Sequence, residues 1–263
     1  MDAIDTSFAP GALREIAVTA AREAGRLQQE AARTRFAIEQ KGPADITTAV
    51  DLACEARIVE VIRAACPDHD LLAEEGTATG GASPYLWIAD PLDGTKNYAH
   101  GYARSCVSIA LLIRGVAALG VVFNARQGEL FVAEAGKGAT LNGERISVSG
   151  VRELGRAMVA SALTYDGRGA DRAQLDRLGR VLGAVEAVRS DGCAALDLCD
   201  VACGRFEAYF ERGLKPWDSA AAALIVQEAG GRVSAFKGAA HDIYAAETFA
   251  SNGQIHEALA ALL

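Results

Sequence analysis

The chain has 263 residues, of which 34 are acidic and 26 are basic, so its formal net charge is −8. Hydrophobic residues make up 51% of it, which is typical of a folded globular protein and excludes an intrinsically disordered chain. A chain of this length buries enough surface to fold without disulfides or structural metals. The acidic balance argues against a broad nucleic-acid-binding face, because such a face needs clustered Lys and Arg.

Six cysteines are scattered along the chain with no CxxC pair and no accompanying histidine cluster. Cys199 and Cys203 are four residues apart, as neighbours on one helix face are, but a zinc site there would need two further ligands. The cysteines are therefore predicted to be buried and reduced, as in cytosolic proteins.

No targeting or membrane segment is expected from the sequence. Residues 1–10 contain no basic region followed by an apolar core, so they do not resemble a signal peptide. The apolar stretch 109–113 is far too short to span a bilayer. We therefore expect a cytoplasmic protein.

Periodicity predicts two helices at the start of the chain and short strands after them. Apolar residues recur at helical spacing over 13–27 and 52–62. The period then changes to two, which predicts strands at 69–73, 85–89, 106–113, 117–123 and 129–135. Gly128 and the Asn142-Gly143 pair are typical of hairpin turns, so we expect a largely antiparallel sheet.

Strands and helices alternate from about Gly150 onward. Strands are expected at 159–163, 185–188, 206–211, 232–235 and 249–251. Helices are expected at 171–182, 194–203, 219–229 and 255–262. This alternation predicts a mixed or parallel sheet covered by helices. Because no Pro-rich or Ser-rich linker is present, we expect two tightly joined subdomains, 1–150 and 151–263, whose seam can hold a site.

The most unusual segment is 87–97, Trp-Ile-Ala-Asp-Pro-Leu-Asp-Gly-Thr-Lys-Asn. An apolar strand delivers Asp90, and the proline that follows is expected to stop the strand because it lacks an amide donor. Asp93 can then turn back beside Asp90. The amides of Gly94 and Thr95, at a helix start, favour an anionic group such as phosphate. Two carboxylates beside an anion site make little electrostatic sense unless a cation lies between them.

Two further acidic positions support this interpretation. Glu74 closes a predicted strand before a flexible Gly/Thr/Ser stretch, and Asp218 precedes an Ala-rich helix. Each acid has an ordinary explanation: an Asx turn for Asp90 and Asp93, a solvated loop for Glu74 and a helix N-cap for Asp218. These explanations account poorly for the acids together. The sequence has no GxSxG, Walker A, complete GxGxxG or HExxH motif, so carboxylates are the remaining candidates for chemistry.

Two separated signatures resemble those of the inositol monophosphatase family of magnesium-dependent, lithium-sensitive sugar and cyclitol phosphatases. Residues 87–97 match the family's DPxDGTxN, and residues 217–231 match its WDxAAxxLIxxEAGG. Residues 41–51 fit its early K-x-D-x-x-T-x-x-D region, and Glu-Glu-Gly at 74–76 is in the expected place. The likeness runs from about residue 12 to residue 251.

The resemblance implies a fold of the α/β (α+β) class. It would be the layered α-β-α-β-α, sugar-phosphatase-type fold, with an antiparallel N-terminal sheet that carries most of the metal ligands and a mixed C-terminal sheet. Members of the family are usually homodimers.

The resemblance also implies a role for each matched residue. One magnesium would be bound by Glu74, Asp90 and the carbonyl of Leu92, and a second by Asp90, Asp93 and Asp218. A third, looser ion would lie near Glu74. Phosphate would be held by the amides of Gly94 and Thr95. The attacking water would be oriented and deprotonated by Glu74 and by Thr95 with Asp51. Other substrate contacts would come from Asp93, Gly192, Cys193, Ala194 and Glu211.

General chemistry supports the implied metals. All-oxygen ligands suit hard magnesium, and two ions about 3.5–4 Å apart can clamp the attacking and leaving oxygens of an in-line displacement. Cys193 stands where the family commonly has Ser or Thr, so a side-chain contact to substrate there would be weaker or absent.

The first functional hypothesis is a myo-inositol-1-phosphate phosphatase, with Glu211 accepting hydrogen bonds from substrate hydroxyls. The alternative within the same chemistry is a histidinol-phosphate phosphatase or another small sugar-phosphate phosphatase. A substrate such as adenosine 3′,5′-bisphosphate would need more basic residues, to bind its second phosphate, than the sequence shows. A different class is protein binding, because bacterial relatives include members that assist transcription complexes. A structural domain that uses a metal ion only for stability would not explain why the amides of Gly94 and Thr95 are expected beside the acids. Neither a membrane nor direct nucleic-acid contact is expected.

Overall fold

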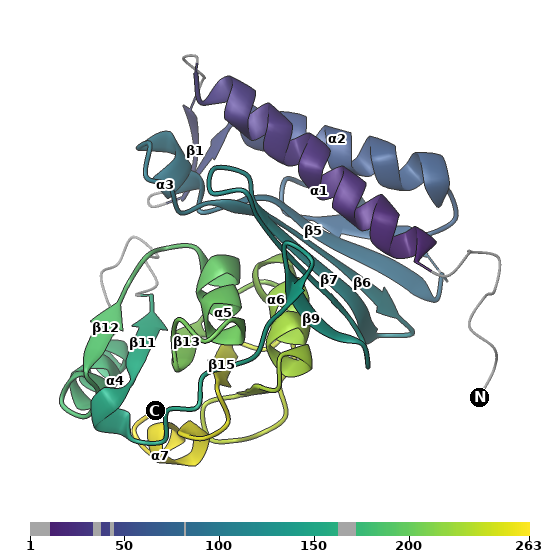
Figure 1. Cartoon of the computed structure of the whole chain (residues 1–263). Helices are drawn as coiled ribbons and strands as arrows, with labels where there is room; N and C mark the ends of the chain where they lie inside the picture. Colours follow the sequence, from purple (N-terminus) through teal and green to yellow (C-terminus); the bar gives the residue numbers. More distant parts are fainter. Residues whose placement is uncertain (1–10, 34–37, 43–44, 82, 163–171) are drawn as a thin grey trace.

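The computed structural model describes residues 11–33, 38–42, 45–81, 83–162 and 172–263. Helices and sheets alternate in layers (Figure 1): α1 and α2 cover one face of a large sheet, α5 and α6 separate it from a second sheet, and α4 and α7 lie beyond. This is the predicted α-β-α-β-α arrangement, and the mixed α/β class is confirmed. Within the described residues, no helix is both long and apolar enough to cross a membrane.

Several sequence predictions fall partly outside the described residues. They are the absence of a signal peptide in 1–10, positions 43–44 of the third signature, the last residue of the strand predicted at 159–163 and the first residue of the helix predicted at 171–182.

The first helix layer consists of α1 (Ala12–Ala31) and α2 (Ala49–Ala65). The face of α1 toward the sheet is built from small residues, which lets the helix lie close to the strands. A two-stranded antiparallel ribbon, β1 (Ile38–Gly42) and β2 (Asp45–Thr48), precedes α2 and was not predicted. Thr48 and Asp51 form a capping box at the start of α2, in which the Asp51 carboxylate accepts from the Thr48 amide at 2.8 Å. The cap fixes Asp51 in the first turn.

The large sheet has eight strands in the order β10-β9-β8-β7-β6-β5-β3-β4. They are β3 (Asp70–Ala73), β4 (Ala78–Thr79), β5 (Tyr85–Asp93), β6 (Cys106–Ile113), β7 (Val116–Asn124), β8 (Glu129–Glu134), β9 (Gly138–Leu141) and β10 (Glu144–Arg145). Neighbouring strands are antiparallel except β3 and β5, so the predicted antiparallel character is confirmed. Asn142 and Gly143 both have positive φ and connect β9 to β10, which confirms the predicted hairpin turn.

The prediction that the proline after Asp90 ends its strand is wrong. β5 continues to Asp93, and its register against β6 shifts between Asp90, opposite Ser108, and Asp93, opposite Cys106. This β-bulge tolerates Pro91 because its extra residue needs no ladder hydrogen bond. Positions 106 and 108 share one face of β6, so the bulge also brings Asp90 and Asp93 to one face of β5.

The second sheet has five strands in the order β12-β11-β13-β15-β14. They are β11 (Met158–Ser161), β12 (Ala187–Arg189), β13 (Ala208–Arg212), β14 (Arg232–Ser234) and β15 (Glu247–Ser251). β11 is parallel to both β12 and β13, whereas β15 is antiparallel to β13 and β14, so the predicted mixed sheet is confirmed.

The remaining helices connect and cover the two sheets. The helices between the sheets are α5 (Ala194–Ala202) and α6 (Pro216–Glu228), and those on the outer face of the second sheet are α4 (Arg172–Leu182) and α7 (His256–Ala260). The short helix α3 (Thr95–Ala99) begins at the helix start expected at Gly94 and Thr95, whereas the 3₁₀ turn η1 (Leu154–Arg156) was not predicted. Three apolar clusters fill the spaces between the layers.

Helix α6 packs closely on the large sheet at Gly120 of β7, where an added Cβ would overlap the carbonyl oxygen of Ala221. We expect Gly120→Ala to lower the free energy of unfolding by about 1–3 kcal/mol, because overpacking forces the helix off the sheet. Urea unfolding measures this effect. Gly150→Ala, where the added methyl meets no atom within 4 Å, is the control. Equal unfolding midpoints for the two variants would show that α6 is not held at this contact.

Candidate active site

Four carboxylates converge where the carboxyl ends of β3 and β5 meet the first turn of α6. Ala73 of β3 is paired with Ala89 of β5, so Glu74, which follows β3, lies beside Asp90 of β5. The Glu74 amide donates to the Ala89 carbonyl at 3.3 Å. Asp93 follows the bulge, and Asp218 faces it from α6. The fold therefore brings together acids that are 144 positions apart in the sequence, from 74 to 218.

The electrostatics show how close these acids are. Burial raises the pKa of Asp90 well above its ordinary value, and the negative charges of Glu74, Asp93 and Asp218 raise it further. Burial also raises the pKa of Asp218, and the charge of Asp93 adds to that shift. Such acids resist ionisation together unless a cation neutralises them. An all-oxygen donor set of this kind fits a hard divalent ion such as magnesium.

The start of α6 differs from the sequence prediction. The helix begins at Pro216, three residues earlier than expected, so Asp218 lies in its first turn and not at the N-cap. Proline is favoured at this first position because its missing amide would be unpaired there anyway. The Asp218 carboxylate still accepts from the Lys215 amide at 2.7 Å. The Ser108 hydroxyl donates to the Trp217 carbonyl at 3.0 Å, which ties the helix start to β6.

Asp93 is held by the N-terminus of α5. Its Oδ2 accepts from the Ala195 amide at 2.7 Å and from the Cys193 thiol at 3.1 Å. Burial raises the pKa of Asp93, and these hydrogen bonds partly oppose the shift. The carboxylate is therefore fixed in orientation by a helix from the second half of the chain.

Thr95 and Asp51 form a hydrogen-bonded pair beside the acids. The Thr95 hydroxyl lies 3.0 Å from Asp51 Oδ1 and 2.9 Å from the Leu92 carbonyl, so its single proton can go to either oxygen. Asp51 is fully buried, and burial raises its pKa. A buried carboxylate next to a hydroxyl can receive a proton passed through it.

Gly94 supplies the turn between β5 and α3. Its φ is +85°, and an added Cβ would lie 2.5 Å from the Arg104 carbonyl oxygen, so only glycine fits. The first amides of a helix have no partner within the helix. The amides of Gly94 and Thr95, which start α3 beside the acids, therefore have no partner within α3.

A cavity of about 410 Å³ opens next to this site. Its lining residues include Asp93, Asp218, Gly192, Ala194 and Glu211. The Tyr209 hydroxyl donates to Glu211, and burial raises the pKa of Glu211 to about 7. Cys193 is buried, and its thiol is directed at Asp93. Its two neighbours in the chain, Gly192 and Ala194, line the cavity.

Sequence reasoning missed Arg104 and gave no role to Asn97. The Arg104 guanidinium bonds Asp197 at 2.5 Å and Asp200 at 2.8 Å, which joins the loop before β6 to α5. The Asn97 amide donates to the carbonyls of Arg104 and Asp191, at 2.8 and 2.7 Å. The sequence did offer one signal for Arg104. The acids at 191, 197 and 200 are close together, and carboxylates that are buried together require a nearby cation.

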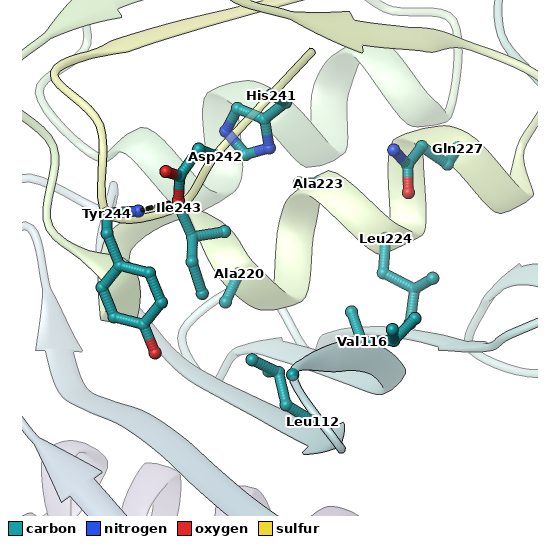
Figure 2. Close-up of a pocket in the computed structure, with 12 residues that line it drawn as sticks. Leu112, Val116, Ala220, Ala223, Leu224, Gln227, His241, Asp242, Ile243 and Tyr244 are labelled. Atoms are coloured by element: carbon teal, nitrogen blue, oxygen red, sulfur yellow. Dashed lines mark hydrogen bonds between the residues drawn. The ribbon is translucent and has the colours of Figure 1, made fainter.

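A second cavity, of about 310 Å³, lies between α6, the turn from β6 to β7 and residues 241–244 (Figure 2). It is lined mainly by apolar side chains such as Leu112 and Leu224, with His241 and Asp242 at one end. The carboxylate of Asp242 accepts from the Tyr244 amide at 2.9 Å, and burial lowers the pKa of His241. Among the described residues that line it, only Asp242 carries a carboxylate, so they do not offer the donor set of the first cavity.

Glu211 gives the metal-free protein a specific pH dependence. Its pKa is about 7 in the fold and 4.5 ordinarily, so its contribution to stability is full below about pH 4.5 and is lost as the pH rises through 7. We expect the melting temperature in EDTA to fall between about pH 5 and about pH 8, and to fall less in Glu211→Gln. Thermal unfolding at both pH values checks this. An equal fall in both proteins would mean that Glu211 ionises freely.

A layered α/β fold that gathers buried and half-buried carboxylates beside the first amides of a helix is consistent with a phosphoric monoester hydrolase, and the comparisons with known proteins establish that class. The model of the inositol monophosphatase family matches residues 11–263. The inositol-1-monophosphatase of Synechocystis sp. is 43% identical over 228 residues, covering 86% of this chain and 79% of that protein. The Nus factor SuhB of Haemophilus influenzae is 43% identical over 224 residues, covering 84% of each chain.

Solved structures agree with the sequence relatives. The inositol monophosphatase structure from Anabaena (Nostoc) sp. superposes with a TM-score of 0.86 at 39% identity, covering 94% of this chain and 93% of that one. The chain belongs to the inositol monophosphatase family.

Proposed function

We propose that this protein is a magnesium-dependent phosphomonoesterase that hydrolyses myo-inositol monophosphate to inositol and inorganic phosphate. The observation that carries the proposal is the convergence of Asp90, Asp93, Asp218 and Glu74 beside the free amides that start α3. Carboxylates that destabilise one another would be costly to maintain without cations, and free amides beside them favour an anion.

By the family resemblance, the acids would form two magnesium-binding sets. One would use Glu74, Asp90 and the Leu92 carbonyl, the second would use Asp90, Asp93 and Asp218, and a third, looser ion would lie near Glu74. Bound magnesium would supply charge neutralisation of the phosphate and a lowered pKa for a coordinated water. The amides of Gly94 and Thr95 would hold the phosphate oxygens.

Proton transfer falls to Thr95, Asp51 and Glu74. The Thr95 hydroxyl, donating to Asp51 at 3.0 Å, can accept a hydrogen bond from the attacking water and pass its proton to the carboxylate. Glu74 would orient the same water from β3. The new bond from water oxygen to phosphorus forms as the ester bond breaks, and the leaving alkoxide takes a proton from solvent.

The polyol part of the substrate would occupy the adjacent cavity. Asp93, Glu211 and the backbone from Gly192 through Cys193 to Ala194 would contact its hydroxyls. With a pKa of about 7, Glu211 can accept a hydrogen bond when ionised and donate one when protonated. It would also pair with an amine, so histidinol phosphate is the main alternative substrate, followed by other small sugar phosphates.

The name of the Synechocystis relative, inositol-1-monophosphatase, supports inositol phosphate as the first choice. We extend the proposal to a cytoplasmic, lithium-sensitive homodimer. We also propose that 1–150 and 151–263 act as two tightly joined subdomains, since Asp93 of the first half is hydrogen-bonded to Ala195 of the second.

Phosphate release from a panel of substrates tests the proposal. Inositol 1-phosphate, histidinol phosphate, fructose 1,6-bisphosphate and adenosine 3′,5′-bisphosphate are each assayed with magnesium, with EDTA and with magnesium plus lithium. We expect the highest kcat/KM for inositol 1-phosphate, with loss of turnover in EDTA and inhibition by lithium. A strong preference for histidinol phosphate would replace the substrate, and turnover that is unaffected by EDTA would reject the mechanism.

The second candidate function is protein binding in a transcription complex, which the relatives named Nus factor SuhB favour. Complementation of a strain that lacks its own copy of the gene distinguishes the two functions. If Asp93→Asn abolishes phosphate release yet restores growth, binding is the operative role. If growth is restored only by proteins that retain turnover, hydrolysis is.

A further inference from the structure

Two cysteines meet beneath the candidate active site. Cys106 begins β6 and Cys193 precedes α5, and their sulfurs lie 3.7 Å apart. Both contact the same oxygen of Asp93: Cys193 Sγ lies 3.1 Å from Oδ2, and Cys106 Sγ lies 4.0 Å from it. The two cysteines are 0% and 1% exposed, whereas Asp93 lines the cavity beside the candidate site.

The triangle formed by the two sulfurs and Oδ2 of Asp93 has the dimensions of a tetrahedral zinc site. With Zn–S bonds of about 2.3 Å and a Zn–O bond of about 2.0 Å, tetrahedral angles place two sulfurs about 3.7 Å apart and each sulfur about 3.5 Å from the oxygen. The observed separations agree to within about half an ångström. Zinc can therefore enter with only small side-chain adjustments.

Charge and ligand softness favour zinc here over magnesium. When Zn²⁺ replaces the two thiol protons, the total charge of the buried cluster is unchanged, since two positive charges enter and two protons leave to solvent. Thiolates are soft ligands that select zinc, whereas the neighbouring all-oxygen acids suit magnesium. The adjacent cavity is lined by Asp93 and by Gly192 and Ala194, the two neighbours of Cys193, so the cluster lies next to solvent-accessible space.

We propose that Cys106, Cys193 and Asp93 form a zinc site that switches the enzyme off when it is occupied. Zinc bound to Oδ2 of Asp93 would neutralise the charge of a carboxylate that is also proposed to bind magnesium. The inhibitory part of this inference rests on the proposed function, whereas the metal site itself does not.

Metal uptake tests the site directly, without any assay of activity. The full-length protein is reduced with a phosphine, freed of metal and titrated with Co²⁺ and Zn²⁺ in excess magnesium. We expect one tightly bound ion per chain, thiolate-to-cobalt charge-transfer absorption with tetrahedral d–d bands, and a native mass that gains one zinc and loses two protons. Absence of the charge-transfer band, or a mass that keeps both protons, would overturn the proposal.

Cysteine variants assign the ligands. Cys106→Ser is expected to weaken zinc binding roughly a hundredfold and to remove most of the charge-transfer absorption. Cys193→Ser should also weaken zinc binding and remove the charge-transfer absorption. It provides an independent test of the ligands if Cys106→Ser does not fold. Cys66→Ser is the matched control, because Cys66 is also buried but lies in the α1–α2 cluster, away from Asp93. Unchanged zinc affinity in both site variants would also overturn the proposal.

The activity arm compares wild type with Cys106→Ser at saturating magnesium and buffered free zinc. We expect zinc to inhibit wild type at a free concentration roughly a hundredfold lower than Cys106→Ser, with Cys66→Ser behaving as wild type. Equal inhibition of all three would show that zinc acts at the magnesium acids and would reject the switch. If no protein hydrolyses any substrate, the proposed function fails, and the spectroscopic result still decides the metal site.

Discussion

Asp93→Asn is expected to lower kcat by on the order of 10³-fold or more, because under the proposed function it removes a carboxylate that would hold a catalytic magnesium ion. The same substitution should raise the melting temperature of the metal-free protein. Burial raises the pKa of Asp93, so its ionised form is disfavoured in the fold, and the neutral amide removes that penalty. Asparagine keeps an oxygen that can accept from the Ala195 amide.

Asp242→Asn is the matched control, because Asp242 lines the second cavity and also accepts a backbone hydrogen bond. It should leave both turnover and metal-free stability close to those of wild type. Steady-state kinetics and thermal unfolding in EDTA measure the two effects. If Asp93→Asn lowers turnover and also destabilises the metal-free protein, the acid is a structural group and the electrostatic account of the site is wrong.

Arg104→Met is expected to lower the free energy of unfolding by about 3–5 kcal/mol, which is the cost of leaving buried acids without their partner. Arg104 is bonded to Asp197 and Asp200, which are buried in α5. Burial already raises the pKa of Asp197 to about 8, and the Arg104 charge opposes that shift. Without the guanidinium, the pKa of Asp197 should therefore rise further.

Arg104→Lys separates charge from geometry, because one ammonium cannot reproduce the planar fork that reaches both acids. It should recover only part of the lost stability. Arg205→Met is the control: Arg205 also bonds Asp200, but it is more exposed, so a smaller loss is expected. Chemical denaturation of the three variants gives the comparison. If Arg104→Met lowers the free energy of unfolding by less than Arg205→Met does, Arg104 does not hold α5 in place.

The sequence predicted the order of helices and strands because the period of its apolar residues changes where the structure changes, whereas the layered arrangement was implied by the family resemblance. The helical spacing over 13–27 and the alternation over 106–113 reflect the faces that these elements bury. The Asn142-Gly143 turn was predictable because few residues adopt positive φ without strain. By contrast, the ribbon formed by β1 and β2 is short and carries little apolar signal, so periodicity missed it.

Local rules failed where tertiary contacts decide. The sequence around Pro91 contains a strand terminator, but whether a strand stops or bulges depends on its neighbour β6. Asp218 was expected as the N-cap before an Ala-rich helix, but α6 begins at Pro216, because proline fits the first turn of a helix. Arg104 and its acids are nearly a hundred positions apart, as are Cys106 and Cys193, so no local pattern could pair them.

The most direct test is the melting temperature of the protein as magnesium is added after removal of metals by EDTA. Because the acids at 74, 90, 93 and 218 repel one another in the metal-free fold, the account predicts a saturable rise that Asp93→Asn greatly reduces. A melting temperature that does not respond to magnesium in the wild-type protein would contradict it.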